Sequence, residues 1–177
     1  MSTEVLDPGI DSEIEFDAPA ESVPQYLTFV VSGEVYGVPI EYVAEIIGAQ
    51  QLTPVPDSRP FMRGVINLRG TVIPVMDVRA RLSMEPRNVD ERTCIVVVQL
   101  DEIVVGLLVD TIADVIDVPP TAIEAAPRRK TASARDAIVT GLFQLEGEVK
   151  ILIDLGRLLH DAPTAFDASP GDENEGS

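Results

Sequence analysis

Four side chains in this sequence could carry chemistry: two aspartates, one histidine and one cysteine. Asp77 stands in "VMDVR" and Asp154 in "LIDLG", at matched strand-like ends. If the fold brought them together, the two carboxylates could share a proton and act as an acid and base pair. Neither stands in an Asp-Thr/Ser-Gly loop, however, and an aspartate at a strand end commonly caps the next turn. We therefore expect caps here and no catalytic residues.

The single histidine and the single cysteine limit the other options. One His160 and one Cys94 exclude a Cys/His zinc site or a disulfide framework within one chain. His160 borders an acidic segment and is expected to be a solvated residue at the end of an element, whereas Cys94 in "TCIVVVQL" is expected to be a buried, inert thiol. The sequence lacks GxxxxGK[ST], GxGxxG and GxSxG motifs. It therefore predicts no enzyme, no metal site and no cofactor.

Charge is concentrated at the two ends of the chain. The net charge is −17; residues 1–24 carry seven acids and no bases, and residues 161–177 carry five acids and no bases. We expect acidic disordered tails at 1–24 and 161–177 around a folded unit at 25–160. A dense basic patch occurs only at "PRRKTASAR", Pro127 to Arg135. Such a chain is expected to avoid nucleic acid and anionic lipid.

Neither a signal peptide nor a membrane span is expected. The N-terminus has no basic region before an apolar run, and the longest apolar run, Ile103 to Val109, is too short to cross a bilayer. The sequence therefore predicts a cytoplasmic protein without direct membrane insertion.

The folded unit repeats itself. Residues 26–47 align with 95–116 at an offset of 69, and residues 64–82 align with 141–159 at an offset of 77. Runs such as "YLTFVV", "CIVVVQL" and "VKILIDL" are rich in β-branched residues. Gly33-Glu34, Arg69-Gly70 and Glu146-Gly147 are expected to form tight hairpin turns. Each copy would be only marginally stable alone, so we predict an all-β protein of two similar small barrels fused along an apolar seam.

One segment of each copy is ambiguous. Ile40, Val43 and Ile46 or Ile47 follow a helical period, and Val109, Ile112 and Val115 or Ile116 repeat it. Each segment is short, so either could equally be a strand.

The copies differ in charge at one hairpin tip, where the first carries Arg69 and the second Glu146. The two could simply be solvated turn residues of opposite sign. Alternatively, the first copy is specialised for a partner, since the planar guanidinium makes two charge-assisted hydrogen bonds. Similarly, Ile40, Val43 and Ile46 either fill the core or leave an apolar face open to a partner helix.

These residues resemble a known family. "GVINLRGTVIPVMDVR" (Gly64 to Arg79), preceded by "TPVP" and "YGVPIEYVAEII" and followed by "VVGLLVDTIADVIDV", is similar to CheW-type chemotaxis coupling proteins. The likeness spans residues 25–160 and implies two intertwined, SH3-like five-stranded β-barrels with a shared apolar core. It also implies a non-enzymatic adaptor in signal transduction. The partners implied are the cytoplasmic tips of chemoreceptors and the regulatory domain of the chemotaxis histidine kinase, with recruitment to membrane-associated receptor arrays.

The resemblance also implies sites. Receptor-groove positions would be Leu27, Ile40, Val43, Ile46 and Val109, and polar partner contacts would be Glu45 and Arg69. Gly64, Asn67, Leu68 and Gly70 would form the hairpin that presents Arg69, whereas the kinase contact at a barrel end is not assigned to residues. From the residues alone, a stand-alone small-barrel ligand-binding module stays open, disfavoured by acidity and by eight aromatic residues without Trp. An unrecognised hydrolase using Asp77 and Asp154 also stays open.

Overall fold

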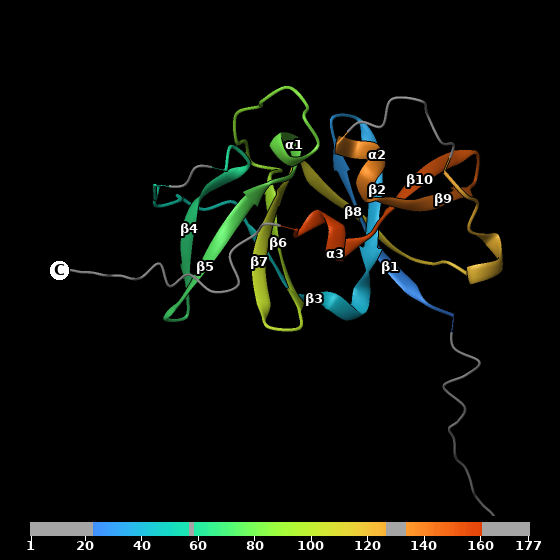
Figure 1. Cartoon of the computed structure of the whole chain (residues 1–177), viewed down its shortest axis with the longest axis horizontal. Helices are drawn as coiled ribbons and strands as arrows, with labels where there is room; N and C mark the ends of the chain where they lie inside the picture. The colour runs from blue at the N-terminus through green and yellow to red at the C-terminus, as the bar shows by residue number, and fades with distance from the viewer. Residues whose placement is uncertain (1–22, 57–58, 127–133, 161–177) are drawn as a thin grey trace, which may run out of the picture.

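The computed structural model describes residues 23–56, 59–126 and 134–160. The predicted acidic tails lie outside these residues apart from Val23 and Pro24, as does segment 127–133 of the basic patch. The described chain is mostly β, as predicted, with a few short helical segments (Figure 1).

Ten strands fall into two series of five that match the sequence repeat. The first series is β1 (Gln25–Val31), β2 (Glu34–Pro39), β3 (Val43–Gly48), β4 (Met62–Leu68) and β5 (Thr71–Asp77), and the second is β6 (Cys94–Leu100), β7 (Ile103–Val109), β8 (Thr111–Asp117), β9 (Val139–Leu145) and β10 (Glu148–Ile153). The helical elements are α1 (Val78–Arg81), α2 (Ala134–Ile138), α3 (Leu155–Leu158) and the 3-10 turns η2 (Ile40–Tyr42) and η3 (Pro120–Ala122). The sequence offsets of 69 and 77 align β1 with β6 and β4 with β9, respectively.

The hairpin turns follow from residues with positive φ. Arg69 and Gly70 have φ of 52° and 87°, and Glu146 and Gly147 have 54° and 82°, so both central residues take the left-handed values of a type I′ turn. These two predicted turns are confirmed. The prediction at Gly33-Glu34 was wrong by one residue, because Ser32 and Gly33 form the turn and Glu34 already pairs with Val31.

The two halves exchange strands. One sheet has the order β3-β6-β7-β5-β4 and is called the first barrel; the other has the order β8-β1-β2-β10-β9 and is called the second barrel. Each barrel therefore combines three strands of one half with two strands of the other. Two of the pairs that join the halves, β5 with β7 and β10 with β2, are parallel, and the other two, β3 with β6 and β1 with β8, are antiparallel. Figure 1 shows the barrels side by side, and the predicted intertwined architecture is confirmed.

Three apolar clusters correspond to one shared core and two barrel interiors. The shared core takes residues from both barrels, including Phe29, Tyr36, Met76, Val98 and Ile153. Within it the rings of Phe29 and Tyr36 stack with centroids 6.3 Å apart. Smaller clusters around Val75 and Leu152 fill the first and second barrels respectively. The fusion along an apolar seam predicted from the size of each copy is therefore present.

A buried carboxylate also joins the barrels. Asp110 lies between β7 of the first barrel and β8 of the second, and its side chain is 8% exposed. It accepts hydrogen bonds from Nε and Nη2 of Arg79 at 2.8 and 2.7 Å, from Nη1 of Arg87 at 3.2 Å and from the Ser32 N–H at 2.9 Å. Burial opposes its ionisation, but these bonds and the charges of both arginines outweigh burial and lower the pKa of Asp110.

Candidate functional surface on the first barrel

The predicted groove residues on η2 and β3 remain accessible. Ile40 and Val43 are half-buried at the margin of the shared core, and Ile46 is 42% exposed. Leu27 and Val109 lie differently: they are 1% and 2% exposed and belong to the shared core itself. Their predicted place in an open groove was wrong, because the alternation of β1 and β7 turns both side chains inward.

A β-bulge explains the helical spacing on β3. Val43 pairs with Val98 and Ile46 pairs with Val96, but the register shifts between Val43 and Glu45. The extra residue places Val43 and Ile46 on the same face although they are three residues apart. Val96 and Val98 both belong to the shared core, so this face is where the core reaches the surface. The segment is a bulged strand after a 3-10 turn, and the helical alternative was wrong.

A shallow depression continues this face beyond the start of β3. Its volume is about 300 Å³, and it is lined by Glu41, Tyr42, Val43, Ala44, Gln99 and Asp101. The negative charge of Glu41, which also hydrogen-bonds the phenol, raises the pKa of Tyr42. The depression is therefore lined mainly by polar side chains, two of which, Glu41 and Asp101, are acidic.

Glu45 and Arg69, predicted as separate polar contacts, lie against each other. Nη1 and Nη2 of Arg69 donate to the two carboxylate oxygens of Glu45 at 2.9 and 2.5 Å, a bidentate pair that connects β3 to the β4–β5 turn. The hydrogen bonds from Arg69 lower the pKa of Glu45. The Arg69 side chain is 72% exposed and the Glu45 side chain 28%, so the guanidinium remains accessible from solvent.

In the predicted presenting hairpin, the Asn67 side chain fixes the turn that carries Arg69. Oδ1 of Asn67 accepts from the Gly70 N–H at 2.9 Å, and Leu68 packs against the interior of the first barrel. Gly64 has a different place from the one predicted, at a register shift near the start of β4. A Cβ there would lie 2.4 Å from the Thr53 carbonyl oxygen, and φ is +146°. Gly64 therefore allows the close passage of another segment rather than shaping the turn.

The second barrel lacks the ion pair. The repeat offsets place Asp114 at the position of Glu45 and Glu146 at the position of Arg69. Both side chains are exposed. An apolar residue recurs at the position of Ile46, because Val115 is 50% exposed. The two barrels thus offer similar exposed apolar residues, but at the position of Arg69 in the first barrel the second has the acid Glu146.

The aspartates considered for catalysis cap helices instead. Oδ1 of Asp77 accepts from the N–H groups of Arg79 and Ala80 at the start of α1, and its Oδ2 accepts from Arg63 at 2.7 Å. Asp154 accepts from the Arg157 N–H at the start of α3. These contacts confirm the capping interpretation.

His160 is exposed after α3, as predicted. Cys94 is half-buried and its Sγ lies 3.3 Å from the Arg92 carbonyl oxygen, so the expectation of a buried thiol was wrong. Its place at the start of β6, beside the end of β3, accounts for the exposure.

Within the described ranges, no group of three or more His, Cys, Asp or Glu side chains could hold a metal ion. No helix in that part of the chain is long and apolar enough to cross a membrane.

Sequence reasoning missed the part of the surface that comes from the other half of the chain. Gln99 and Asp101 reach the depression because β6 pairs with β3. The pairing of those strands has no local sequence signal, although the Asp101 turn could have been found from its match to Ser32.

Comparison with known proteins identifies the family. The CheW-like domain model matches residues 25–163. The chain is 34% identical to chemotaxis protein CheW of Klebsiella aerogenes over 142 residues, which cover 80% of this chain and 85% of that protein. It is 34% identical to chemotaxis protein CheW of Bacillus subtilis over 133 residues, covering 75% and 85%, and 31% identical to protein FrzA of Myxococcus xanthus over 147 residues, covering 82% and 91%.

A solved structure agrees. The scaffolding protein TtCheW of Thermoanaerobacter tengcongensis superposes with a TM-score of 0.71 at 29% identity, over 79% of this chain and 94% of that one. The fold is that of a two-barrel protein of the same class as this scaffolding protein. The chain belongs to the CheW-like domain family. Its likeness to chemotaxis CheW proteins and to a CheW scaffolding protein supports a role for this chain as a chemotaxis adaptor.

Proposed function

We propose that this protein is a non-enzymatic adaptor that couples the cytoplasmic tips of chemoreceptors to the chemotaxis histidine kinase. Membership of the CheW-like family supports this role, and so does the structural likeness to the scaffolding protein TtCheW. The protein would act in the cytoplasm and be recruited to receptor arrays at the membrane.

The observation that carries the proposal is the apolar face of β3 beside the Arg69 and Glu45 pair. Ile40 and Val43 are half-buried against the shared core, and the exposed Ile46 pairs with the core residue Val96. A receptor's helical hairpin would bury this surface by laying an apolar stripe along it. The bidentate pair would then form part of a polar rim that fixes the register of the helix.

Coupling follows from assembly rather than turnover. A second contact, at a barrel end, would pair with the similar regulatory domain of the kinase. Modest interfaces on two faces of one small protein can join many receptors and kinases, because multivalency multiplies their affinities. The state of the receptor would reach the kinase through different affinities for the bridged states.

Charge reversal at Arg69 tests the receptor contact. The variant Arg69→Glu is expected to fold, because Glu146 occupies the matched turn position with φ of 54°. Receptor affinity should fall roughly tenfold, as for a rim charge facing a charged partner. The measurements are co-sedimentation with receptor-containing membranes and receptor-dependent kinase autophosphorylation, with circular dichroism as the check on folding.

A reciprocal exchange separates a partner contact from an internal one. The double variant Glu45→Arg with Arg69→Glu restores an ion pair with its polarity reversed. If the rim faces a partner of fixed charge, kinase activation stays low. Recovery of full activation would show that the pair acts only within the barrel and would contradict the proposed rim.

Substitution at Ile46 tests the apolar part of the surface, with a matched control. Ile46→Lys should abolish receptor-dependent activation, whereas Val115→Lys, at the equivalent exposed position of the second barrel, should leave most of it. Equal loss from both variants would remove the special role of β3. Direct binding to the kinase regulatory domain, measured by titration calorimetry at low and high salt, tests the second contact independently.

A further inference from the structure

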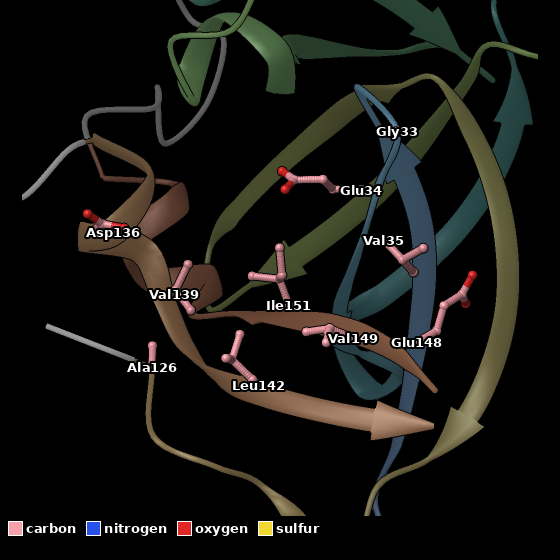
Figure 2. Close-up of a pocket in the computed structure, with 10 residues that line it drawn as sticks. All are labelled: Gly33, Glu34, Val35, Ala126, Asp136, Val139, Leu142, Glu148, Val149 and Ile151. Atoms are coloured by element: carbon pink, nitrogen blue, oxygen red, sulfur yellow. The ribbon is translucent and has the colours of Figure 1, made fainter. Parts of the chain in front are cut away.

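The second barrel carries a cavity that shares no residue with the β3 surface. Its volume is about 390 Å³, and it lies against β2, β9, β10 and the start of α2. Leu142 and Ile151 are cross-strand partners, and Val149 is on the same face two residues before Ile151. These three apolar side chains line its floor. In Figure 2, Ile151 and Leu142 lie below Glu34 and Asp136.

The rim of this cavity is acidic. Glu34, Asp136 and Glu148 line it, and they are the charged residues among the described ones that do so. Glu34 accepts a hydrogen bond from the buried Tyr36 hydroxyl at 2.9 Å, which orients its carboxylate. Glu148 pairs with Lys150, whose side chain is 9% exposed while that of Glu148 is 67% exposed. At the rim the Glu148 carboxylate is therefore exposed to solvent, whereas the Lys150 ammonium group is buried.

The three acids of the rim do not recur at the matched positions of the first barrel. The repeat offsets place Ile103 at the position of Glu34, Arg59 at that of Asp136 and Thr71 at that of Glu148. All three acids are therefore replaced by apolar, basic or neutral residues at the matched positions. The apolar floor recurs in part, since Val72 matches Val149 and the two are 43% and 44% exposed. The three rim acids thus belong to the second barrel, although Glu102 of the first barrel stands at the position of Gly33.

We propose that this cavity is a docking site for a basic peptide segment of a partner protein. One apolar side chain of the segment would contact Leu142, Val149 and Ile151, and a neighbouring arginine or lysine would lie beside the rim carboxylates. A volume of about 390 Å³ is in the range of small-ligand pockets and accommodates a large side chain. A buried apolar anchor supplies most of the affinity at such contacts, and charge complementarity selects the partner.

This site goes beyond the adaptor function proposed above. The proposal is based on the cavity and the charge at its rim, so a substitution on the β3 surface that abolishes receptor coupling should leave peptide binding at the cavity unchanged.

The test uses the full chain and two fluorescein-labelled peptides. The probe is acetyl-Arg-Leu-Phe-Arg-amide, and the control is acetyl-Glu-Leu-Phe-Glu-amide. Fluorescence anisotropy should show saturable binding of the basic peptide that weakens as salt rises, and at least tenfold weaker binding of the acidic peptide. Amide chemical shifts of the labelled protein should change around Leu142 and Ile151.

Matched variants locate the site. Val149→Arg places a cation at the cavity and should weaken the basic peptide at least tenfold, whereas Val72→Arg, at the matched exposed position of the first barrel, should change affinity less than twofold. Thermal melting checks that both variants fold. Equal binding of the two peptides, equal effects of the two variants, or shift changes confined to the first barrel would each overturn the proposal.

One further outcome would also overturn it. If the basic peptide binds only after Arg128, Arg129 and Lys130 are replaced by serine, the cavity belongs to the chain's own basic segment rather than to a partner.

Discussion

Removal of the Asp110 carboxylate should strongly destabilise the joined barrels. In Asp110→Ala, the guanidinium of Arg79, 13% exposed, loses both hydrogen bonds at 2.7 and 2.8 Å, and the Ser32 N–H loses its acceptor. Breaking a buried ion pair by removing one partner costs about 3 to 5 kcal/mol, because the other charge stays desolvated. For a domain of this size that corresponds to a fall of roughly 6 to 20 °C in Tm.

A control within the same network separates burial from charge. Arg87 also donates to Asp110, at 3.2 Å, but its side chain is 44% exposed. Arg87→Gln should therefore cost less than about 1 kcal/mol, as surface ion pairs do.

The assay is urea unfolding followed by circular dichroism, with the slope compared between variants. A loss below about 1 kcal/mol for Asp110→Ala, or equal losses for the two variants, would refute the reasoning that the buried pair joins the barrels.

Three further predictions concern pH, backbone and caps. Because the pKa of Asp110 is lower in the folded state, its contribution to stability is fully present above an unfolded-state pKa of about 3.9 and is lost as pH falls through the folded value. The free energy of unfolding of Asp110→Asn, measured with urea at several acid pH values, should therefore depend less on pH than that of the wild type. Gly64→Ala should cost at least about 2 kcal/mol, because of positive φ and the approach to Thr53, whereas Gly48→Ala, with open space around it, should be nearly neutral; similar urea midpoints for the two would contradict this. Asp154→Ala should lower stability by about 0.5 to 2 kcal/mol through loss of the α3 cap, and a hydrolase screen in which wild type turns over substrate and this variant does not would instead support the acid–base alternative.

The repeat made the strand positions predictable. Two offsets in the sequence placed matched strands and turns in both halves, because the same pattern of β-branched residues and turn residues folds into the same local structure each time. The caps at Asp77 and Asp154 were predictable for the same reason, since a capping bond joins residues two or three positions apart. The turn at Arg69 was also predictable from the sequence, because Gly70 supplies the second positive φ.

Burial at single positions was less predictable. Leu27 and Val109, predicted as groove positions, lie in the core, whereas Ile46, which is equally apolar, is exposed. A bulge that shifts β3 by one residue decides which side chains face outward, and no residue type requires that bulge.

By itself, the sequence determined an all-β chain of two similar units, its hairpins, its caps and the absence of common catalytic motifs, because these depend on composition and on neighbours along the chain. Only the tertiary structure decided the exchange of strands between halves, the meeting of Glu45 with Arg69 and the joining of Asp110 to Arg79. The partners in those contacts are 24 and 31 residues apart. They meet because burying the shared apolar seam fixes how the barrels pack, and side chains far apart in sequence are brought together by that packing.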